Sequence, residues 1–483
     1  MVTEETTDTL AQSKAESHYL HDYFFPKSIA IIGASQRLNF GSTFFLSSLR
    51  HGYEGKVYPV NPKYDTVHNM KCYPNLTSIG EQMDMVISCI PAKFVPDLVK
   101  ECVKTNAKFI TVFTSGFAEV GNYKLQNELL ENIKGSNTRI VGPNCLGAHC
   151  TKSRITFNGD ASFKEGNVSF CSQSGGHASA FLEIGPTRKV YYSKGVSFGN
   201  QSDLNCVDFL DYYSQDEDTQ VIGMYLESFG SGNAQLFLQK LKEITKNKCV
   251  VIWKGGQTKA GQKAAASHTG AIAASIKLWE AALKQHGAIL VKNKTEFMDC
   301  LHLASVLDIK PKGAKIGIVF IGGGGSVEIT DVFSTYGFEV PELLPETQEK
   351  LDKILPDVNT SLKNPVDLGA TGILVDVYMK VLRIVANDPN IDIVITQYAM
   401  DRLLRVEQEM RVPNFAVSFA RSFGRLKKNL NIPLIFLATI FRDSDIVTRT
   451  VLRFTETLHD LNIPSFPTIE RAANSLAYYL GMK

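Results

Sequence analysis

The chain has 483 residues, of which 44% are hydrophobic and 21% are charged, and its formal net charge is +2. This length and composition indicate a globular protein of about three domains, and the near-neutral charge, without a concentrated basic run, argues against a nucleic-acid-binding protein. No apolar stretch is long enough to span a membrane, and the polar leader, residues 1–22, lacks the features of a signal peptide. The nine cysteines are scattered without a Cys-x-x-Cys pair, which implies neither a disulfide framework nor a metal site. We therefore expect a cytoplasmic protein.

Short β-branched runs alternate with helix-length segments from about residue 28 onward, which predicts parallel sheets with helices on both faces. In residues 23–150 the expected strands are 28–33, 56–60, 85–90 and 109–113. We expect this segment to form a Rossmann-like domain of the nucleotide-binding type.

Two further series of strands follow. Residues 151–310 contain five expected strands, which are 168–171, 190–193, 221–226, 250–253 and 288–291, and these fit a flavodoxin-like domain. Residues 309–313 break both periods and are typical of a linker. Residues 311–483 contain expected strands at 316–321, 391–395 and 432–437. The predicted fold class is therefore α/β, with a Rossmann-like domain followed by two flavodoxin-like domains.

Three loops of the first segment follow expected strands, where open α/β sheets bind ligands. Residues 33–41 precede a helix expected from about Ser42, so that their amides and the helix dipole suit a phosphate. Their glycine spacing is not Gly-x-Gly-x-x-Gly, and a glycine turn needed for close packing is the alternative explanation. Residues 61–63 add a cation, Lys63, and residues 90–91 end the third expected strand.

A similar loop, residues 171–176, follows the first strand of the second segment and opens a helical pattern at 177–184. Its two serines supply hydroxyls, and its two glycines leave amides exposed at the start of the helix. This suits a free or covalently bound phosphoryl group. An ordinary serine N-cap is the alternative.

His268 lies in a tract of small residues, 264–272, between two helical patterns. Small neighbours, together with the conformational freedom of Gly270, leave such a histidine accessible, which suits a nucleophile or a ligand. The alternative is an alanine-rich helix whose histidine caps one end. Glu227 follows an expected strand and can accept the Nδ1 proton of His268, which leaves Nε2 to face phosphorus; the alternative is a solvated acid at the end of a strand.

Eight sequence blocks together resemble the NDP-forming acyl-CoA synthetases, also called ADP-forming acetate–CoA ligases, which are relatives of succinyl-CoA synthetase. The blocks occupy residues 31–35, 58–62, 114–119, 142–147, 172–175, 267–270, 322–325 and 364–367. They follow the order of that family, and the resemblance covers nearly all of residues 24–483.

The resemblance implies a role for each candidate residue. It implies that the first domain binds coenzyme A through Gly33, Ala34, Ser35, Asn61, Pro62, Lys63, Ile90, Pro91, Ser115, Asn144 and Cys145. It implies a phosphate-binding helix N-terminus made of Ser172, Gln173, Ser174, Gly175 and Gly176. His268 would carry the phosphoryl group transiently, and Glu227 would orient it.

The implied reaction interconverts acyl-CoA, NDP and phosphate with acid, CoA and NTP. The family needs an ATP-grasp module, and no segment here remains for one, so the order of domains resembles the α chain of the two-subunit enzymes. The resemblance thus implies a β subunit that holds the NDP or NTP with magnesium, in an α2β2 assembly. The small organic acid stays open between acetate, a branched acid and an aryl acid, as does the choice between ADP and GDP.

Two other functions compete with this one. A non-catalytic CoA-binding sensor or scaffold would not need His268, Glu227 and the Ser-Gln-Ser-Gly loop, which are all intact. An NAD-dependent oxidoreductase built on the first domain is disfavoured by the glycine spacing and by Asn61, which stands where an acidic residue would bind a ribose.

Overall fold

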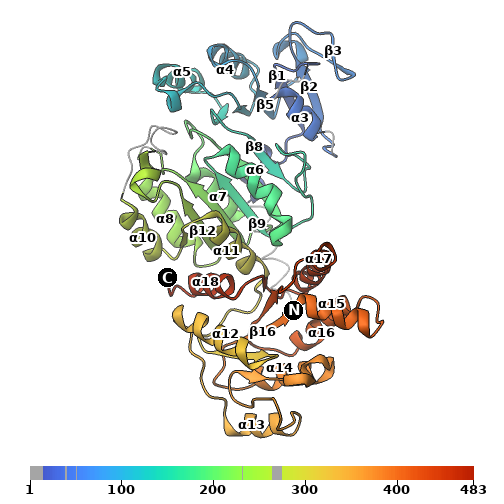
Figure 1. The fold of residues 1–483 in the computed structure, drawn as a ribbon. Coiled ribbons are helices and arrows are strands. Elements are labelled where there is room, and N and C mark those ends of the chain that lie inside the picture. The colour runs from blue at the N-terminus through green and yellow to red at the C-terminus, as the bar shows by residue number, and fades with distance from the viewer. Residues whose placement is uncertain (1–14, 38–40, 50–51, 231, 264–274) are drawn as a thin grey trace, which may run out of the picture. The chain divides into compact units, whose positions relative to one another are not determined.

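The computed structural model describes residues 15–37, 41–49, 52–230, 232–263 and 275–483. It divides into two compact units, residues 1–297 and 298–483, called here the first and second units. Three mainly parallel sheets, two in the first unit and one in the second, are flanked by helices (Figure 1). The predicted α/β fold class is confirmed, whereas the division into three domains with the stated boundaries stays a prediction.

The first sheet has the strand order β2-β1-β5-β6-β7, and all its strands are parallel. Its strands are β1 (Ser28–Ile32), β2 (Lys56–Val60), β5 (Met85–Ser88), β6 (Phe109–Val112) and β7 (Arg139–Val141). Around it lie α2 (His21–Phe24), α3 (Ser42–Leu49), α4 (Val95–Lys104), α5 (Tyr123–Ile133) and a small hairpin of β3 (Thr66–Val67) and β4 (Met70–Lys71). Alternate strand residues such as Ala30 and Val86 share one apolar cluster with Leu98 of α4.

The second sheet has the order β13-β12-β11-β9-β10-β8, in which β8 is antiparallel to β10. Its strands are β8 (Gly147–Cys150), β9 (Val168–Ser172), β10 (Tyr192–Ser197), β11 (Val221–Leu226), β12 (Cys249–Lys254) and β13 (Ile289–Val291). Its helices are α6 (Gly175–Ile184), α7 (Cys206–Gln215), α8 (Ala234–Ile244), α10 (Ile276–Gln285) and α11 (Lys294–Val306), the last of which crosses the boundary between the units. β9, β10 and β11 are buried along their whole length, as expected for a sheet covered on both faces.

Besides shifts of one residue at the ends of β9, β12 and β13, two details of this sheet differ from the sequence prediction. The sheet has six strands instead of five, because β8 adds an antiparallel edge. β10 begins at Tyr192 instead of residue 190, because the Val190 amide donates a hydrogen bond to the Gly185 carbonyl at 2.9 Å and so closes the preceding turn.

The third sheet, in the second unit, has the order β15-β14-β16-β17-β18. Its strands are β14 (Ile316–Phe320), β15 (Val366–Asp367), β16 (Ile393–Ala399), β17 (Leu434–Thr439) and β18 (Ser465–Phe466). Its helices are α12 (Gly323–Thr335), α13 (Pro345–Asp352), α14 (Val375–Ala386), α15 (Met400–Glu409), α16 (Phe415–Lys427), α17 (Asp445–Asp460) and α18 (Ile469–Tyr479).

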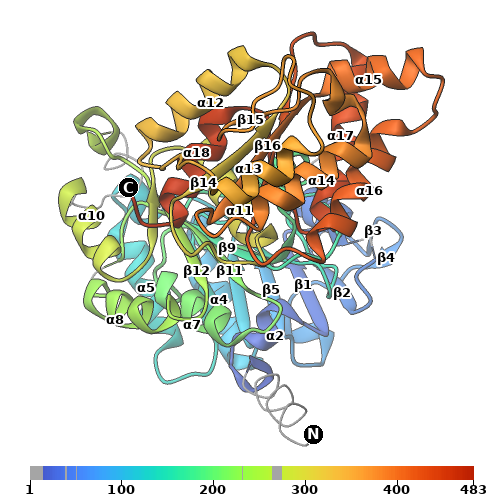
Figure 2. The same cartoon turned by 90° about the horizontal axis from the view of Figure 1, so that it is seen from below.

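Two apolar clusters cover the faces of this third sheet. Ile393 and Ile395 of β16 pack in one cluster with α12 and α18, whereas Val394 packs in the other with α14, α16 and α17. This alternation follows from the two-residue period of a strand. Figure 2 shows the resulting three layers of helix, sheet and helix in the second unit.

Each sheet contains five parallel strands whose spatial order, numbered along the chain, is 2-1-3-4-5. In such sheets ligands bind beyond the carboxyl ends of the strands, where the order reverses. The expected ligand crevices therefore follow β1 and β5, β9 and β11, and β14 and β16. Every helix in the described ranges is too short or too polar to cross a lipid bilayer.

Candidate active site

The loops after β1 and β2 are connected by a hydrogen bond. The Asn61 side-chain amide donates to the Ala34 carbonyl at 2.7 Å, and the Lys63 amide donates to Asn61 Oδ1 at 3.0 Å. Gly33 has a φ of 87°, and a Cβ atom there would lie 3.0 Å from the Cys89 carbonyl oxygen. Close packing alone therefore requires glycine at this position, so Gly33 by itself does not identify a ligand.

The first unit contains a cavity of about 780 Å³ between the loops of its two sheets. From the predicted sites it brings together Ile90, Pro91, Ser115, Asn144, Cys145, Gln173, Ser174, Gly175 and Gly176. The cavity is also lined by residues that are not among the predicted site residues, which are Gly41 of the 33–41 loop, Cys89, Phe113, Thr114, Leu146 and Ser179. The lining does not include Gly33, Ala34, Ser35, Asn61, Pro62, Lys63, Ser172 or Glu227.

The turn at Asn144 lies between the loops of the first sheet and the start of α6, which both line this cavity. Asn144 has a left-handed φ of 59°, and its amide donates to the Thr114 carbonyl at 3.1 Å. The Thr114 hydroxyl in turn donates to the Ile90 carbonyl at 2.6 Å. Cys145 is 2% exposed, and burial raises the pKa of its thiol. Its side chain is therefore a neutral group in the wall of the cavity.

Helix α6 begins at Gly175, two residues before the predicted start. Ser174 is its N-cap, with the hydroxyl oxygen accepting a hydrogen bond from the His177 amide at 3.4 Å. The first amides of a helix have no carbonyl partner within the helix, which makes this end attractive to anions. A Cβ atom on Gly175 would lie 3.1 Å from Leu146 Cγ, whereas Gly176 is exposed. The two explanations of this loop are therefore compatible, because Ser174 caps the helix while Gly176 stays exposed beside it.

Glu227 directly follows β11, which neighbours β9 in the sheet. Gln173 holds this loop against the start of α6, because its side-chain oxygen accepts from the Glu227 amide and, at 2.8 Å, from the Ser228 amide. Glu227 thus belongs to the crevice that follows β9 and β11. His268 lies outside the described residues, so its hydrogen bond to Glu227 stays a prediction.

Lys254 ends β12 and lies opposite Leu226 in the sheet register. Its side chain is 5% exposed, and burial lowers its pKa, an effect that the charge of Glu227 opposes. The sequence indicates the run Lys254-Gly-Gly256 ahead of the His268 tract, but it predicts no role for Lys254. Among the described residues, no group of three or more His, Cys, Asp or Glu side chains could hold a metal ion.

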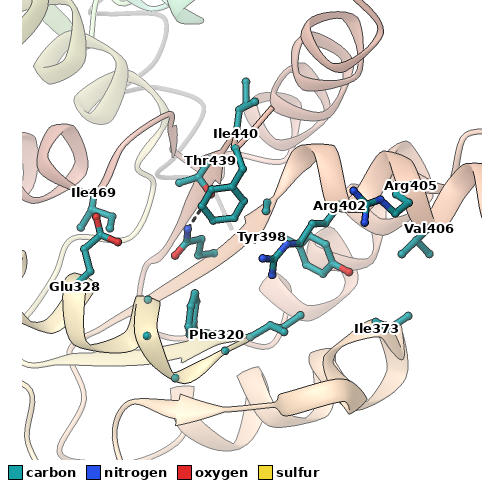
Figure 3. A pocket seen from close by; sticks show the side chains of 18 of the residues that line it. Phe320, Glu328, Ile373, Tyr398, Arg402, Arg405, Val406, Thr439, Ile440 and Ile469 are labelled. Atoms are coloured by element: carbon teal, nitrogen blue, oxygen red, sulfur yellow. Dashed lines mark hydrogen bonds between the residues drawn. The ribbon is translucent and has the colours of Figure 1, made fainter. Parts of the chain in front are cut away.

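A second cavity, of about 770 Å³, follows β14 and β16 in the second unit. It is lined by residues 322–325 at the start of α12, by two arginines and three glutamates, and by aromatic side chains (Figure 3). In Figure 3, Glu328 lies at one end of this cavity, and Arg402 and Arg405 lie at the other. Because both signs of charge line this cavity, its lining does not select one class of ligand. Residues 322–325 form one of the family sequence blocks, but the sequence predicts no role for them.

Two family models match this chain. The "CoA binding domain" matches residues 27–151, and the "Succinyl-CoA ligase like flavodoxin domain" matches residues 165–304. The α subunit of acetate–CoA ligase [ADP-forming] II from Pyrococcus furiosus is 34% identical over 377 residues, which cover 77% of this chain and 81% of that subunit. Acetate–CoA ligase [ADP-forming] from Methanocaldococcus jannaschii is 36% identical over 345 residues, which cover 71% of this chain and 48% of that protein.

The fold also matches a solved structure along its length. It superposes with a TM-score of 0.82 and 29% identity on the dinucleotide-forming acetyl-coenzyme A synthetase 1 from Ca. Korarchaeum cryptofilum, solved with phosphate and ADP, and 96% of each chain is covered. The chain spans about half the length of several curated relatives, but it spans four fifths of the Pyrococcus furiosus α subunit. The resemblance inferred from the sequence blocks is confirmed, and the chain belongs to the family of NDP-forming acyl-CoA synthetases.

Proposed function

We propose that this chain is the α-type subunit of an acid–CoA ligase that interconverts acyl-CoA, NDP and phosphate with acid, CoA and NTP. The observation that carries this proposal is the first cavity, where loops of the CoA-binding domain and the capped start of α6 face the same space. The names of the relatives support the same reaction class, since they are ADP-forming acetate–CoA ligases. A CoA sensor or scaffold would not require an anion-binding helix start beside the CoA loops.

In this proposal the loops after β1, β2 and β5 hold coenzyme A, and the turn at Asn144 and Cys145 lies near the thioester. An oxygen of inorganic phosphate attacks the thioester carbonyl carbon, the C–S bond breaks, and the thiolate takes the phosphate proton to give free CoA and acyl phosphate. The open amides at the start of α6 offset the negative charge of the phosphoryl group, because they are fixed before the reaction begins.

His268 then takes the phosphoryl group. Its Nε2–P bond forms as the bond from phosphorus to the acyl oxygen breaks, and the acid leaves as a carboxylate. The nucleophile must be a neutral imidazole, and the ordinary pKa of histidine, about 6.5, leaves most of it neutral at the pH of a cell. Glu227 accepts the Nδ1 proton in a hydrogen bond and stabilises the positive charge that develops on the ring.

The second half-reaction passes the phosphoryl group from His268 to NDP. We assign the nucleotide and its magnesium to an ATP-grasp β subunit in an α2β2 assembly. Support comes from the relative named as an α subunit, of which this chain covers 81%. The organic acid stays open between acetate, a branched acid and an aryl acid.

The first test is incubation of the purified chain with acyl-CoA and radiolabelled phosphate. We expect release of CoA and an acid-labile, base-stable label that maps to His268, without transfer to added ADP or GDP. Adding a β subunit with an ATP-grasp fold should restore NTP formation. The two-subunit proposal is wrong if the chain alone phosphorylates ADP, and the phosphohistidine proposal is wrong if CoA is released without labelled protein.

A further inference from the structure

Tyr225 is the last but one residue of β11, and Glu227 directly follows that strand. Residues two apart along a strand project to the same face, which brings these two side chains together. The Tyr225 hydroxyl donates to Glu227 Oε1 at 3.2 Å. Burial, and then the negative charge of Glu227, raise the pKa of Tyr225, so the phenol keeps its proton and remains a hydrogen-bond donor.

The ring of Tyr225 is held from two sides. Its centroid lies 4.4 Å from the His177 ring in the first turn of α6, and 4.8 Å from the Trp253 ring on β12. The His177 and Trp253 rings are themselves 4.6 Å apart. Such contacts restrict the tilt of the phenol, and they fix the point from which its hydroxyl meets the carboxylate.

Gly255 has no side chain, and this leaves room for the side chains of Tyr225 and Glu227. A Cβ atom at position 255 would lie 2.5 Å from the Tyr225 hydroxyl oxygen and 3.1 Å from Glu227 Cγ. The Gly255 amide donates to the Leu226 carbonyl at 2.9 Å, which anchors the loop after β12 beside the pair. A side chain at position 255 would therefore displace the phenol, the carboxylate or both.

We propose that Tyr225 is a positioning residue, which holds the Glu227 carboxylate in the orientation that receives the imidazole of the phosphoryl carrier. This inference rests on the proposed function, because it gives a role in phosphoryl transfer to a residue outside the lining of the first cavity. Without the hydroxyl, the Glu227 side chain keeps its charge but samples more rotamers. The rate of phosphoryl transfer should fall while the binding of substrates is unchanged.

The test compares Tyr225→Phe with Tyr213→Phe. Tyr213, on α7, is a matched control because it is also a buried tyrosine. Its hydroxyl donates to the Phe170 carbonyl of β9 at 2.9 Å instead of to Glu227. We expect Tyr225→Phe to slow single-turnover phosphohistidine formation about tenfold, with CoA affinity and the half-saturating phosphate concentration unchanged within twofold. Tyr213→Phe should lower the melting temperature and leave this rate constant unchanged.

A double-mutant cycle with Gly255→Ala separates positioning from general damage. Gly255→Ala in the unmodified chain should slow phosphohistidine formation, because the new methyl group meets the phenol oxygen. In the Tyr225→Phe background the same change should add much less than in the unmodified chain, since the closest clash is gone. Thermal unfolding curves of all four proteins establish that each one folds.

The outcomes distinguish this inference from the proposed function. If the unmodified chain forms no phosphohistidine, the proposed function fails, and the inference fails with it. If the unmodified chain is labelled and Tyr225→Phe is labelled at the same rate, the positioning role alone is wrong. Equal slowing by Tyr225→Phe and Tyr213→Phe, or fully additive effects in the cycle, would also overturn it.

Discussion

Replacing His268 with alanine is expected to abolish acyl-CoA formation while coenzyme A still binds. The change removes the imidazole that carries the phosphoryl group, and no other group in the proposed reaction replaces it. The CoA-binding model matches residues 27–151, so the loops assigned to CoA lie in a different part of the chain. We expect activity to fall by about four orders of magnitude or more. The measurements are the rate of acyl-CoA synthesis with the β subunit present, and calorimetric titration with CoA.

A second histidine provides the control for this change. His286, at the end of α10, contacts the Ala282 carbonyl through Nδ1 at 2.6 Å and has no role in the proposed reaction. His286→Ala should therefore retain activity. His268→Asp supplies a negative charge but no nucleophilic nitrogen, and it should be as inactive as the alanine variant. Loss of CoA binding in His268→Ala would show instead that the histidine has a structural role.

The long central strands could be predicted from the sequence, whereas the short ones could not. Residues 221–226 form an uninterrupted apolar run that is buried on both faces, and the predicted bounds agree with β11. β15 and β18 contain two residues each, which is too few to produce a period. β8 pairs as an antiparallel edge, a placement that depends on β10 and leaves no mark in its own four residues.

The candidate site shows the same division between local and tertiary information. A serine followed by two glycines predicts a capped helix start, but the low helix propensity of glycine places the expected start two residues too late. Thr114 and Leu146 line the first cavity because separate loops converge there, which no local pattern records. Tyr225 reads as an ordinary apolar strand residue, and its hydrogen bond to Glu227 becomes visible when the side chains are placed.

Roles in catalysis came from the family resemblance more than from physical patterns. Spacing and residue type indicated ligand-binding loops at the ends of strands, and the strand order of each sheet supports that expectation. Neither the residue pattern nor the strand order identifies the ligand as coenzyme A. Gly33, for example, is required by its packing against Cys89 whether or not a ligand binds there. The family models and relatives supply that missing step, because they match segments that contain these loops.

Glu227→Gln is expected to slow phosphoryl transfer about a hundredfold or more, by analogy with the removal of other orienting acids. Glutamine keeps the size of the side chain, and its amide oxygen can still accept a hydrogen bond from the Tyr225 hydroxyl. What is lost is the negative charge that favours the Nδ1–H tautomer and stabilises the developing imidazolium. The measurement is the single-turnover rate of phosphohistidine formation from acyl-CoA and labelled phosphate, with CoA affinity determined in parallel.

Glu243→Gln is the matched control for the loss of one negative charge. Glu243 lies on α8 with a side chain that is 65% exposed and paired with Lys246, so its replacement should leave the rate unchanged. A Glu227→Gln rate within a few-fold of the unmodified chain would remove Glu227 from the mechanism.

The double variant Glu227→Gln with Tyr225→Phe tests whether the two residues act together. If Tyr225 acts through the Glu227 carboxylate, the second change should cost far less in the glutamine background than in the unmodified chain, because the charge that the phenol positions is already absent.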